Sequence, residues 1–426
     1  MTEIPFHHDP VEPLEFVPVK RQGRSRPRFP AAYRPLLMID VIHDGRYLPP
    51  EFLLDEDGEP HPRDDYFDDY VRERDWGASV VAGRLADQLG LNGYYKVNTA
   101  RVLLDFGRFP GSTTHHAAHL QRFAINYPFC DLLGFRQKKR LLEEHYDVIS
   151  QRMDQALEGK LLKIAVHTYD KHNPSGTARP HVSLVTRSVG FRIDSETPLG
   201  LHDPMFPQVL GEFTADRMLR DRVSLTLEKH GIPVGHDYPY LLPEGSPEVR
   251  SQVWSFFRFL QQRFEDAHPD TAERSEYQLV WEMLLDTNLR DSESETLRSY
   301  IHTFRRAPRG RVREFARAQV AYREIDAFCR ADDHSIVRDY RYSDTRHSSL
   351  GIEVRKDLVW DFDDAGHPVR PNPDNALAIA NVIAEGLATY LREDRKAIPE
   401  IRETRFPRDE AWGTPASTAD SVVVSR

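Results

Sequence analysis

The sequence predicts an α/β protein with a mostly parallel or mixed β-sheet that is flanked by helices. Short continuous apolar runs, such as 36–42 and 161–166, are typical of strands that are buried on both faces. Segments with apolar residues at helical spacing alternate with these runs, and this alternation favours parallel pairing. Between about residues 247 and 338 strand signals almost vanish. We therefore expect a large helical insertion within the α/β body.

The first part of the chain predicts an arm followed by a strand and a helix. Residues 1–35 are rich in Pro and Arg with little periodicity, so we expect an extended arm that forms no element. The run 36–42 predicts the first strand, which ends at the turn Asp44-Gly45. Apolar residues at helical spacing follow Trp76 and end at Gly90, a residue suited to a helix C-cap. Residues 94–105 predict the next strand.

The remaining body elements follow the same alternation. Residues 137–157 place apolar side chains on one helical face and lead into a strand at 161–166. A further strand is expected at 182–185 and an amphipathic helix at about 214–229.

The helical insertion is followed by a return to the sheet. Within the insertion, apolar side chains recur at helical spacing, for example from Val249 to Phe264. Residues 349–354 then predict a strand, and 375–390 predict a closing helix. We expect four parts, namely the arm 1–35, an α/β domain of 36–246 with 339–400, the helical insertion 247–338 and a flexible tail 401–426.

Composition limits the classes of protein that fit. The 426 residues are 39% hydrophobic and 29% charged, which suits a large globular core. Only two cysteines occur, so we expect no disulfide framework and a reducing compartment. No run of about 18 apolar residues and no apolar signal core are present, so we expect a cytoplasmic protein without a membrane span. The net charge of −10 argues against a general nucleic-acid binder.

Three isolated polar residues are candidates for a metal site. His43 and His167 each follow a short apolar run, and Asp75 precedes a predicted helix. The carboxyl ends of strands in an open α/β sheet are where ligands collect, and catalytic zinc takes three protein ligands, usually His with Asp or Glu. A single His after a strand is more often a hydrogen-bonded loop residue, but the three together favour a metal site. A set of two His and one carboxylate also suits other divalent metals, such as iron or manganese.

A general base and several arginines complete the candidates. Glu353 lies inside an apolar strand, where an ionised carboxylate is costly unless it is paired, and Arg355 alternates to the same face. A structural ion pair of Glu353 with an arginine is the alternative. Arg101 and Arg108 flank Asp105, and arginines can bind carboxylates or stabilise an oxyanion.

The order of these motifs resembles the N-formylglutamate amidohydrolase family. Each motif is short, but the ordered series is specific and covers about 36–245 and 340–392. The matching residues are His43 with Gly45, Asp75 with Gly77 and Ala78, Arg101 with Asp105 and Arg108, His167 with Thr168, Gly176 with Arg179 and Pro180, Tyr238 to Tyr240, and His347 with Gly351 to Leu358.

The resemblance implies a fold similar to zinc carboxypeptidases and zinc-dependent hydrolysis of an amide on an N-formyl or other N-acyl amino acid. It implies that zinc is bound by His43, Asp75 and His167, that Glu353 acts as the base and that Arg101 stabilises the oxyanion. The residues that it implies for binding the substrate are Arg108, Arg179, Arg355, Tyr240 and His347. One departure is Gly107, where the family often has Asn, and the change removes an amide that could bind a substrate carboxylate.

Two alternative hypotheses about the function also fit the sequence. A carboxypeptidase-like hydrolase could act on a peptide or a specialised metabolite. Alternatively, a non-catalytic scaffold could use the insertion 247–338, whose arginine-rich stretch 305–317 is more typical of a solvated helix face. We expect a small-molecule amide as the main partner, and the insertion leaves open a homo-oligomer or a protein partner.

Overall fold

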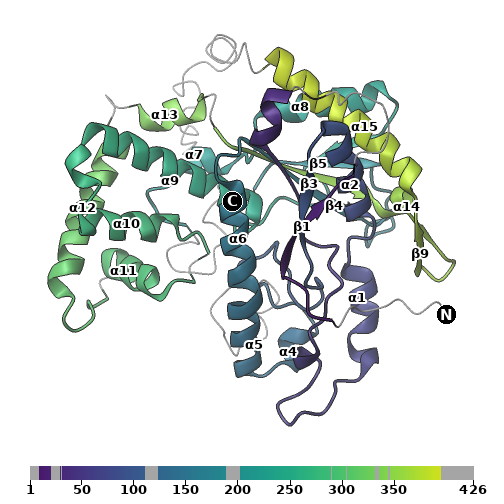
Figure 1. Ribbon diagram of the computed structural model, residues 1–426, viewed down its shortest axis with the longest axis horizontal. Helices are drawn as coiled ribbons and strands as arrows, with labels where there is room; N and C mark the ends of the chain where they lie inside the picture. Colours follow the sequence, from purple (N-terminus) through teal and green to yellow (C-terminus); the bar gives the residue numbers. More distant parts are fainter. Residues whose placement is uncertain are drawn as a thin grey trace, which may run out of the picture.

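A seven-stranded mixed β-sheet lies at the centre of the protein (Figure 1). The structure is a computed structural model that describes residues 9–20, 29, 31–110, 123–188, 202–288, 290–303, 305–331, 335–343 and 346–394. The strand order is β1-β3-β2-β4-β7-β5-β6. The strands are β1 (Leu14–Pro18), β2 (Leu37–Val41), β3 (Gly93–Val97), β4 (Leu162–Tyr169), β5 (Val182–Val185), β6 (Val234–His236) and β7 (Ser348–Arg355).

The four central strands of the sheet run parallel, and the strands on either side of them run in the opposite direction. Strands β3, β2, β4 and β7 run parallel to one another, whereas β1 is antiparallel to β3 and β5 is antiparallel to β7. Strand β6 pairs with β5 in parallel. The predicted α/β class with a mixed sheet flanked by helices is therefore confirmed.

The predicted N-terminal arm contributes an edge strand, so the expectation that it forms no element was wrong. Residues Leu14–Pro18 pair with Gly93–Val97 along the whole of β1. Edge pairing uses backbone hydrogen bonds, and only Leu14 of this strand is buried, which explains why the sequence showed no apolar pattern. Residues 401–426, predicted as a flexible tail, lie outside the described residues.

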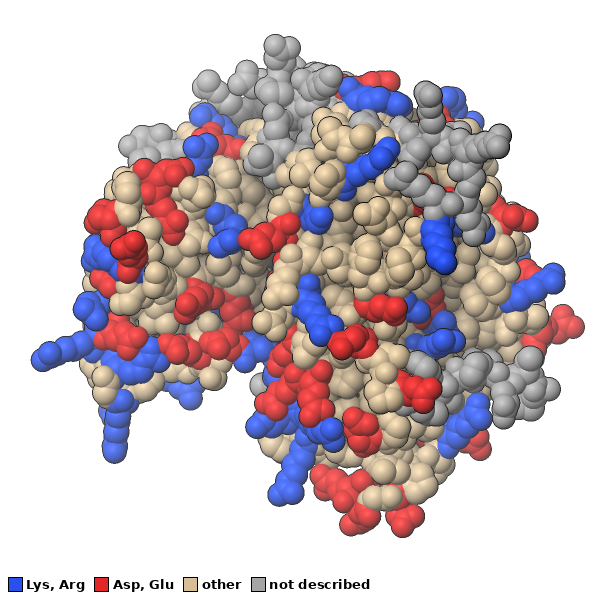
Figure 2. All heavy atoms as spheres, viewed as in Figure 1, with Lys and Arg blue, Asp and Glu red and all other residues tan. Residues whose placement is uncertain are grey.

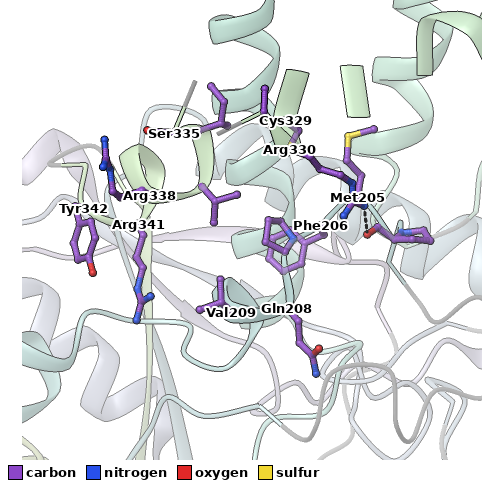
Figure 3. A pocket seen from close by; sticks show the side chains of 15 residues that line it. Met205, Phe206, Gln208, Val209, Cys329, Arg330, Ser335, Arg338, Arg341 and Tyr342 are labelled. Atoms are coloured by element: carbon purple, nitrogen blue, oxygen red, sulfur yellow. Dashed lines mark hydrogen bonds between the residues drawn. The ribbon is translucent and has the colours of Figure 1, made fainter. Parts of the chain in front are cut away.

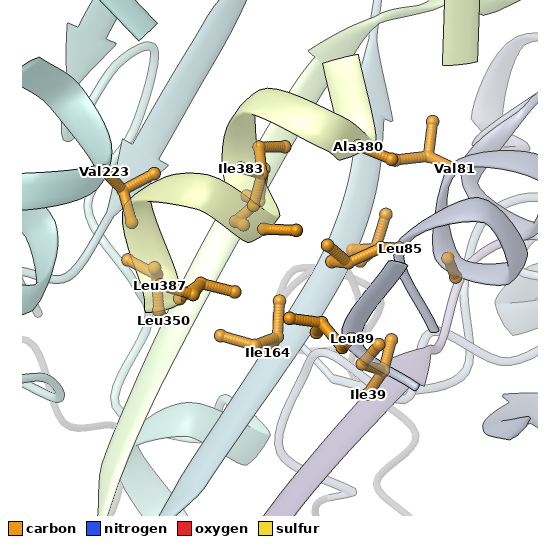
Figure 4. Packing of buried hydrophobic residues seen from close by; sticks show 14 of the residues in the cluster. Ile39, Val81, Leu85, Leu89, Ile164, Val223, Leu350, Ala380, Ile383 and Leu387 are labelled. Carbon is orange, nitrogen blue, oxygen red and sulfur yellow. The ribbon is translucent and has the colours of Figure 1, made fainter. Parts of the chain in front are cut away.

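One face of the sheet is covered by three helices and is mostly apolar. Helices α2, α8 and α15 pack on this face, and α15 contacts both of the others (Figure 4). The strands present the side chains of Ile39, Ile164 and Ile352 to them, because alternate residues of a strand point to the same face. Figure 4 shows Leu85, Leu89, Ile383 and Leu387 meeting Ile39 and Ile164 in this layer.

The opposite face carries buried polar side chains. Asp40, Lys163, Ser349, His167 and Glu353 alternate with the apolar set on β2, β4 and β7, and all five are buried. The first turn of α9 meets this face, since Lys163 Nζ lies 2.8 Å from Glu248 Oε1 and 3.1 Å from Asp40 Oδ2. The two faces of one sheet therefore have different chemistry.

Helices α9 to α13 lie between β6 and β7 in the sequence and beside the sheet in space (Figure 1). Their apolar side chains form a second core with Val185, Met205, Phe206, Leu210 and Leu242. All regular elements described from Pro247 to Arg341 are helical, as predicted. Whether this region is a separate domain stays a prediction.

The α-helices fall into two groups, those of the α/β body and those of the helical region. The body contains α1 (Phe67–Glu73), α2 (Ala78–Leu89), α4 (Phe129–Leu132), α5 (Phe135–Leu141), α6 (Asp147–Leu157), α7 (Gln208–Gly211), α8 (Arg217–Lys229), α14 (Lys356–Val359) and α15 (Pro373–Thr389). The helical region contains α9 (Pro247–Ala267), α10 (Ser275–Leu285), α11 (Ser292–Thr303), α12 (Val312–Arg330) and α13 (Ile336–Arg341). A small hairpin pairs β8 (Trp360–Phe362) with β9 (Pro368–Pro371).

The strand predicted at 94–105 is shorter than expected. It ends at Val97, because Ala100 donates to Tyr47 O and its own carbonyl accepts from Leu103 and Leu104 in a helical turn. The residues after Val97 were predicted as strand but form a turn. This turn carries Arg101 and leads to Asp105, and it therefore supplies polar side chains.

The surface mixes charges of both signs. Figure 2 shows Lys and Arg interspersed with Asp and Glu on the visible face. Among the helices that the structure describes, none is long and apolar enough to cross a membrane.

Candidate metal centre

His43, Asp75 and His167 come together at the carboxyl end of the parallel strands. Each offers one ligand atom, and these atoms lie within 4.8 Å of one another. His43 follows β2, His167 lies in β4 next to β2, and Asp75 precedes α2. All three side chains are buried. This group could bind a metal ion.

The backbone holds Asp75 between the two strands. Asp75 N donates to His43 O at 3.0 Å, and Thr168 Oγ1 donates to Trp76 O at 3.1 Å. The chain then turns into α2 at Gly77, whose φ of 92° favours glycine. Asp75 is therefore fixed relative to both histidines by contacts that do not involve its carboxylate.

The ring nitrogens converge on one carboxylate oxygen. His43 Nδ1 lies 3.5 Å from Asp75 Oδ2, and His167 Nδ1 lies 3.1 Å from the same atom. Two imidazole nitrogens and one carboxylate oxygen are a donor set that zinc and several other divalent metals accept.

Asp105 orients His43, a role that the sequence did not assign. Asp105 Oδ1 lies 2.7 Å from His43 Nε2 and also accepts from Gly107 N at 2.9 Å. A carboxylate at Nε2 favours the tautomer with the proton there, which leaves the lone pair of Nδ1 available to bind a metal ion. The sequence signal was only the position of Asp105 between Arg101 and Arg108.

Gly107 lies against this hydrogen bond. A Cβ at this position would come within 2.9 Å of both His43 Nε2 and Asp105 Oδ1. A side chain here, such as the Asn that is common in the resembled family, would require His43 or Asp105 to move. The observed arrangement of His43 and Asp105 therefore requires glycine at this position.

The charges of the group stabilise one another. Burial alone would lower the pKa of His167, but its hydrogen bond to Asp75 and the nearby charge of Glu353 raise that pKa to about 9. Burial alone would raise the pKa of Asp75, yet the two histidines and Arg101 hold it below its ordinary value. The carboxylate of Asp75 is therefore ionised and faces both imidazole rings.

Glu353 lies beside His167 in the sheet. The two residues are register partners on β4 and β7, so their side chains leave the sheet on the same face. Burial raises the pKa of Glu353, and the charge of Asp75 raises it further. The hydroxyl of Tyr240 donates to Glu353 Oε1. A buried carboxyl with a raised pKa is suited to accepting and returning a proton.

The four predicted arginines differ in their partners. Arg101 lies 3.3 Å from both Asp75 Oδ1 and Asp105 Oδ2, and Arg108 Nε lies 3.1 Å from Asp105 Oδ2. Arg355 forms a two-pronged ion pair with Asp357. Arg179 contacts the ring of Tyr169.

His347 does not lie with this group, and its predicted role in binding substrate stays a prediction. It precedes the first residue of β7, whereas Glu353 is the sixth residue of that strand, so the two lie about 20 Å apart along the chain. His347 Nδ1 lies 2.9 Å from Lys160 O, at the amino end of the sheet.

A separate cavity of about 650 Å³ lies between α7, α12 and α13 (Figure 3). Figure 3 shows Met205, Phe206 and Val209 with Arg330, Arg338 and Arg341 around it. None of the predicted site residues lines this cavity.

Comparisons with known proteins show no family for this chain. No protein-family model and no curated protein matches the sequence. An N-formylglutamate amidohydrolase from Ralstonia eutropha JMP134 is similar in structure at a TM-score of 0.43 and 12% identity, over 92% of this chain and 99% of that one. A gene product from Agrobacterium tumefaciens is similar at a TM-score of 0.38 and 13% identity, over 85% and 92%. The interpretation of the site therefore depends on its own residues.

Proposed function

We propose that the protein is a metal-dependent amidohydrolase that cleaves a linear amide bond of an N-formyl or other N-acyl amino acid. The observation that carries the proposal is the position of Glu353 beside His167, next to a buried His43–Asp75–His167 group that could bind a metal. The ordered sequence motifs that resemble the N-formylglutamate amidohydrolase family support the same reaction. The similarity to a zinc carboxypeptidase fold stays a prediction.

The proposed metal is zinc, with another divalent ion as the alternative. His43, Asp75 and His167 would hold it, and the bound ion would supply Lewis-acid chemistry and lower the pKa of a water molecule. Asp105 would keep the ring of His43 in the required tautomer and orientation.

Glu353 has the position and the environment of a general base. In the proposed reaction its carboxylate accepts a proton from the attacking water and then delivers a proton to the nitrogen of the leaving amine. The Tyr240 hydroxyl holds one carboxylate oxygen, which fixes the direction of the transfer.

Arg101 is proposed to stabilise the oxyanion that forms at the amide carbonyl. Its Nε and Nη1 are held by Asp105, Asp75 and the carbonyl of Glu73, and these contacts fix the guanidinium at the edge of the site. A fixed cation near developing negative charge stabilises a transition state without reorganisation.

Exchange of Glu353 for Gln tests this function. Zinc-loaded wild-type protein and Glu353→Gln are compared on a panel of N-formyl amino acids, N-acetyl amino acids and dipeptides by the release of free amine. We expect wild-type hydrolysis of the N-acyl amino acids and a loss of about 10²- to 10⁴-fold in Glu353→Gln. Zinc content should be equal in both proteins.

The matched control is Glu228→Gln on the exposed surface of α8, which should keep wild-type activity. Hydrolysis of dipeptides alone would favour the carboxypeptidase-like alternative. Activity in Glu353→Gln equal to wild type would contradict the proposed base, and absence of hydrolysis by the zinc-loaded protein on the whole panel would favour the scaffold alternative.

A further inference from the structure

Arg179 differs from the other predicted arginines because it has no carboxylate partner among the described residues. Arg101, Arg108 and Arg355 are each within 3.3 Å of an Asp oxygen. Arg179 instead has its guanidinium carbon 5.2 Å from the centre of the Tyr169 ring, and its buried Nε has no hydrogen-bond partner. A guanidinium offers five donors, and a buried donor without an acceptor is costly.

The surroundings of Arg179 hold it near the candidate metal centre. Tyr169 is two residues beyond His167 on β4, so both side chains share a face about 7 Å apart along the strand. Tyr169 is itself fixed, because its hydroxyl donates to Pro180 O at 2.8 Å. Glu353 is the register partner of His167 on β7, so the face that carries Tyr169 also carries the proposed base.

The loop that carries Arg179 is ordered by its own hydrogen bonds. Arg179 N donates to Lys171 O, and Asn173 Oδ1 accepts from Ser175 Oγ and Thr177 N. Asn173 Nδ2 also donates to Tyr238 OH at 3.3 Å. The guanidinium is thus presented by a fixed hairpin.

We propose that Arg179 is the specificity-determining residue that binds the substrate carboxylate, and that the preferred substrate carries one carboxylate, as in an N-acyl amino acid with an uncharged side chain. This inference rests on the proposed function. A second carboxylate would have to compete with Asp75, Asp105 or Asp357 for an arginine that is already paired. Gly107, which supplies no side-chain amide, is consistent with the same preference.

The test uses three compounds that differ only in charge. They are N-formylglutamate with two carboxylates, N-formylglutamine with one and N-formylglutamine α-amide with none, together with the corresponding N-acetyl series. Hydrolysis is measured in the wild type and in Arg179→Met. Binding is measured by calorimetry in the zinc-loaded Glu353→Gln background, with and without Arg179→Met, so that turnover does not interfere.

We expect the compounds with one carboxylate to bind at least about tenfold more tightly than either relative, because hydrogen bonds to a charged group contribute strongly. Arg179→Met should weaken the binding of these compounds by about 10- to 100-fold. In hydrolysis the loss should appear in KM rather than in kcat. The binding of the α-amide and the zinc content should not change. Arg179→Lys should restore part of the loss, and the exposed Arg263→Met on α9 serves as the control.

Several results would overturn the inference. These are equal or tighter binding of the two-carboxylate compounds, an equal effect of Arg179→Met on acid and amide, or no binding of any compound. If nothing is hydrolysed but the one-carboxylate compounds bind in an Arg179-dependent manner, the proposed function fails and the assignment of Arg179 holds.

Discussion

The two faces of the central sheet are made by the same strands and differ in almost every property. On one face Ile39, Ile164 and Ile352 pack under α2, α8 and α15. On the other face Asp40, Lys163, His167 and Glu353 are equally buried but ionisable. The apolar face is a packing surface that many side chains can satisfy. The polar face needs a specific partner for each charge.

Burying ionisable side chains on the polar face costs free energy, and this cost indicates that the face has a specific role. A buried charge is tolerated only when it is paired and hydrogen-bonded. At the amino end of the face Lys163 is shared by Asp40 and Glu248, so that part is paired within the protein. At the carboxyl end the side chains of His43, Asp75 and His167 converge beside Glu353, and their donor atoms could bind a metal ion.

The largest expected difference between the faces is in stability. Lys163→Met leaves Asp40 and Glu248 buried without their cation and should lower the free energy of unfolding by about 3–5 kcal/mol. The neighbouring Ile164→Val, on the apolar face, should lower it by only about 0.5–1.5 kcal/mol. Urea unfolding at pH 7 measures both. Equal losses would contradict the contrast, and the triple variant Asp40→Asn, Lys163→Met, Glu248→Gln should recover part of the loss.

The next effect concerns the pH dependence of stability and His347, which precedes the strand that carries Glu353. Burial lowers the pKa of His347 to about 4, whereas an unfolded His titrates near 6.5. Below pH 6.5 the unfolded chain therefore binds a proton that the folded protein does not, and stability falls as the pH falls. Between pH 7 and 4.5, wild type should lose about 2–3 kcal/mol more than His347→Gln in urea unfolding. An equal loss of unfolding free energy in the two proteins would show that His347 is not buried in its neutral form.

A smaller effect is expected at Asp105, which supports the polar face from a loop. Asp105→Asn should weaken zinc binding by about 10- to 100-fold, since the carboxylate that orients His43 Nε2 is lost. Competition with a chelator of known zinc affinity measures this change. Asp326→Asn in α12, which removes a surface ion pair with Arg330, is the control. Unchanged affinity in Asp105→Asn would mean that His43 is not oriented by this contact.

The sequence was sufficient to predict the residues that parallel strands bring together. His43 follows β2, His167 lies near the end of β4 and Glu353 is its register partner on β7. The sequence predicted these residues as polar positions in or after buried strands, and the observed order β2-β4-β7 brings them together. The apolar runs likewise predicted which segments form the buried strands.

Contacts made by turns and by the helical region could not be predicted. Asp105 reaches His43 from a turn that the sequence read as strand, and Glu248 pairs with Lys163 across 85 residues of chain. The motif that contains His347 did not indicate that this residue lies just before the amino end of β7, away from Glu353. The edge strand β1 was missed because backbone pairing at an edge needs no apolar pattern.

The central claim is that the carboxyl end of the polar face binds a metal ion. The most direct test is elemental analysis of untagged wild-type protein, Asp75→Asn and His167→Ala, purified identically without added metal. We predict about one zinc or another divalent metal per chain in the wild type and a loss in both variants. Absence of metal from all three proteins, even after zinc is added, would contradict the claim.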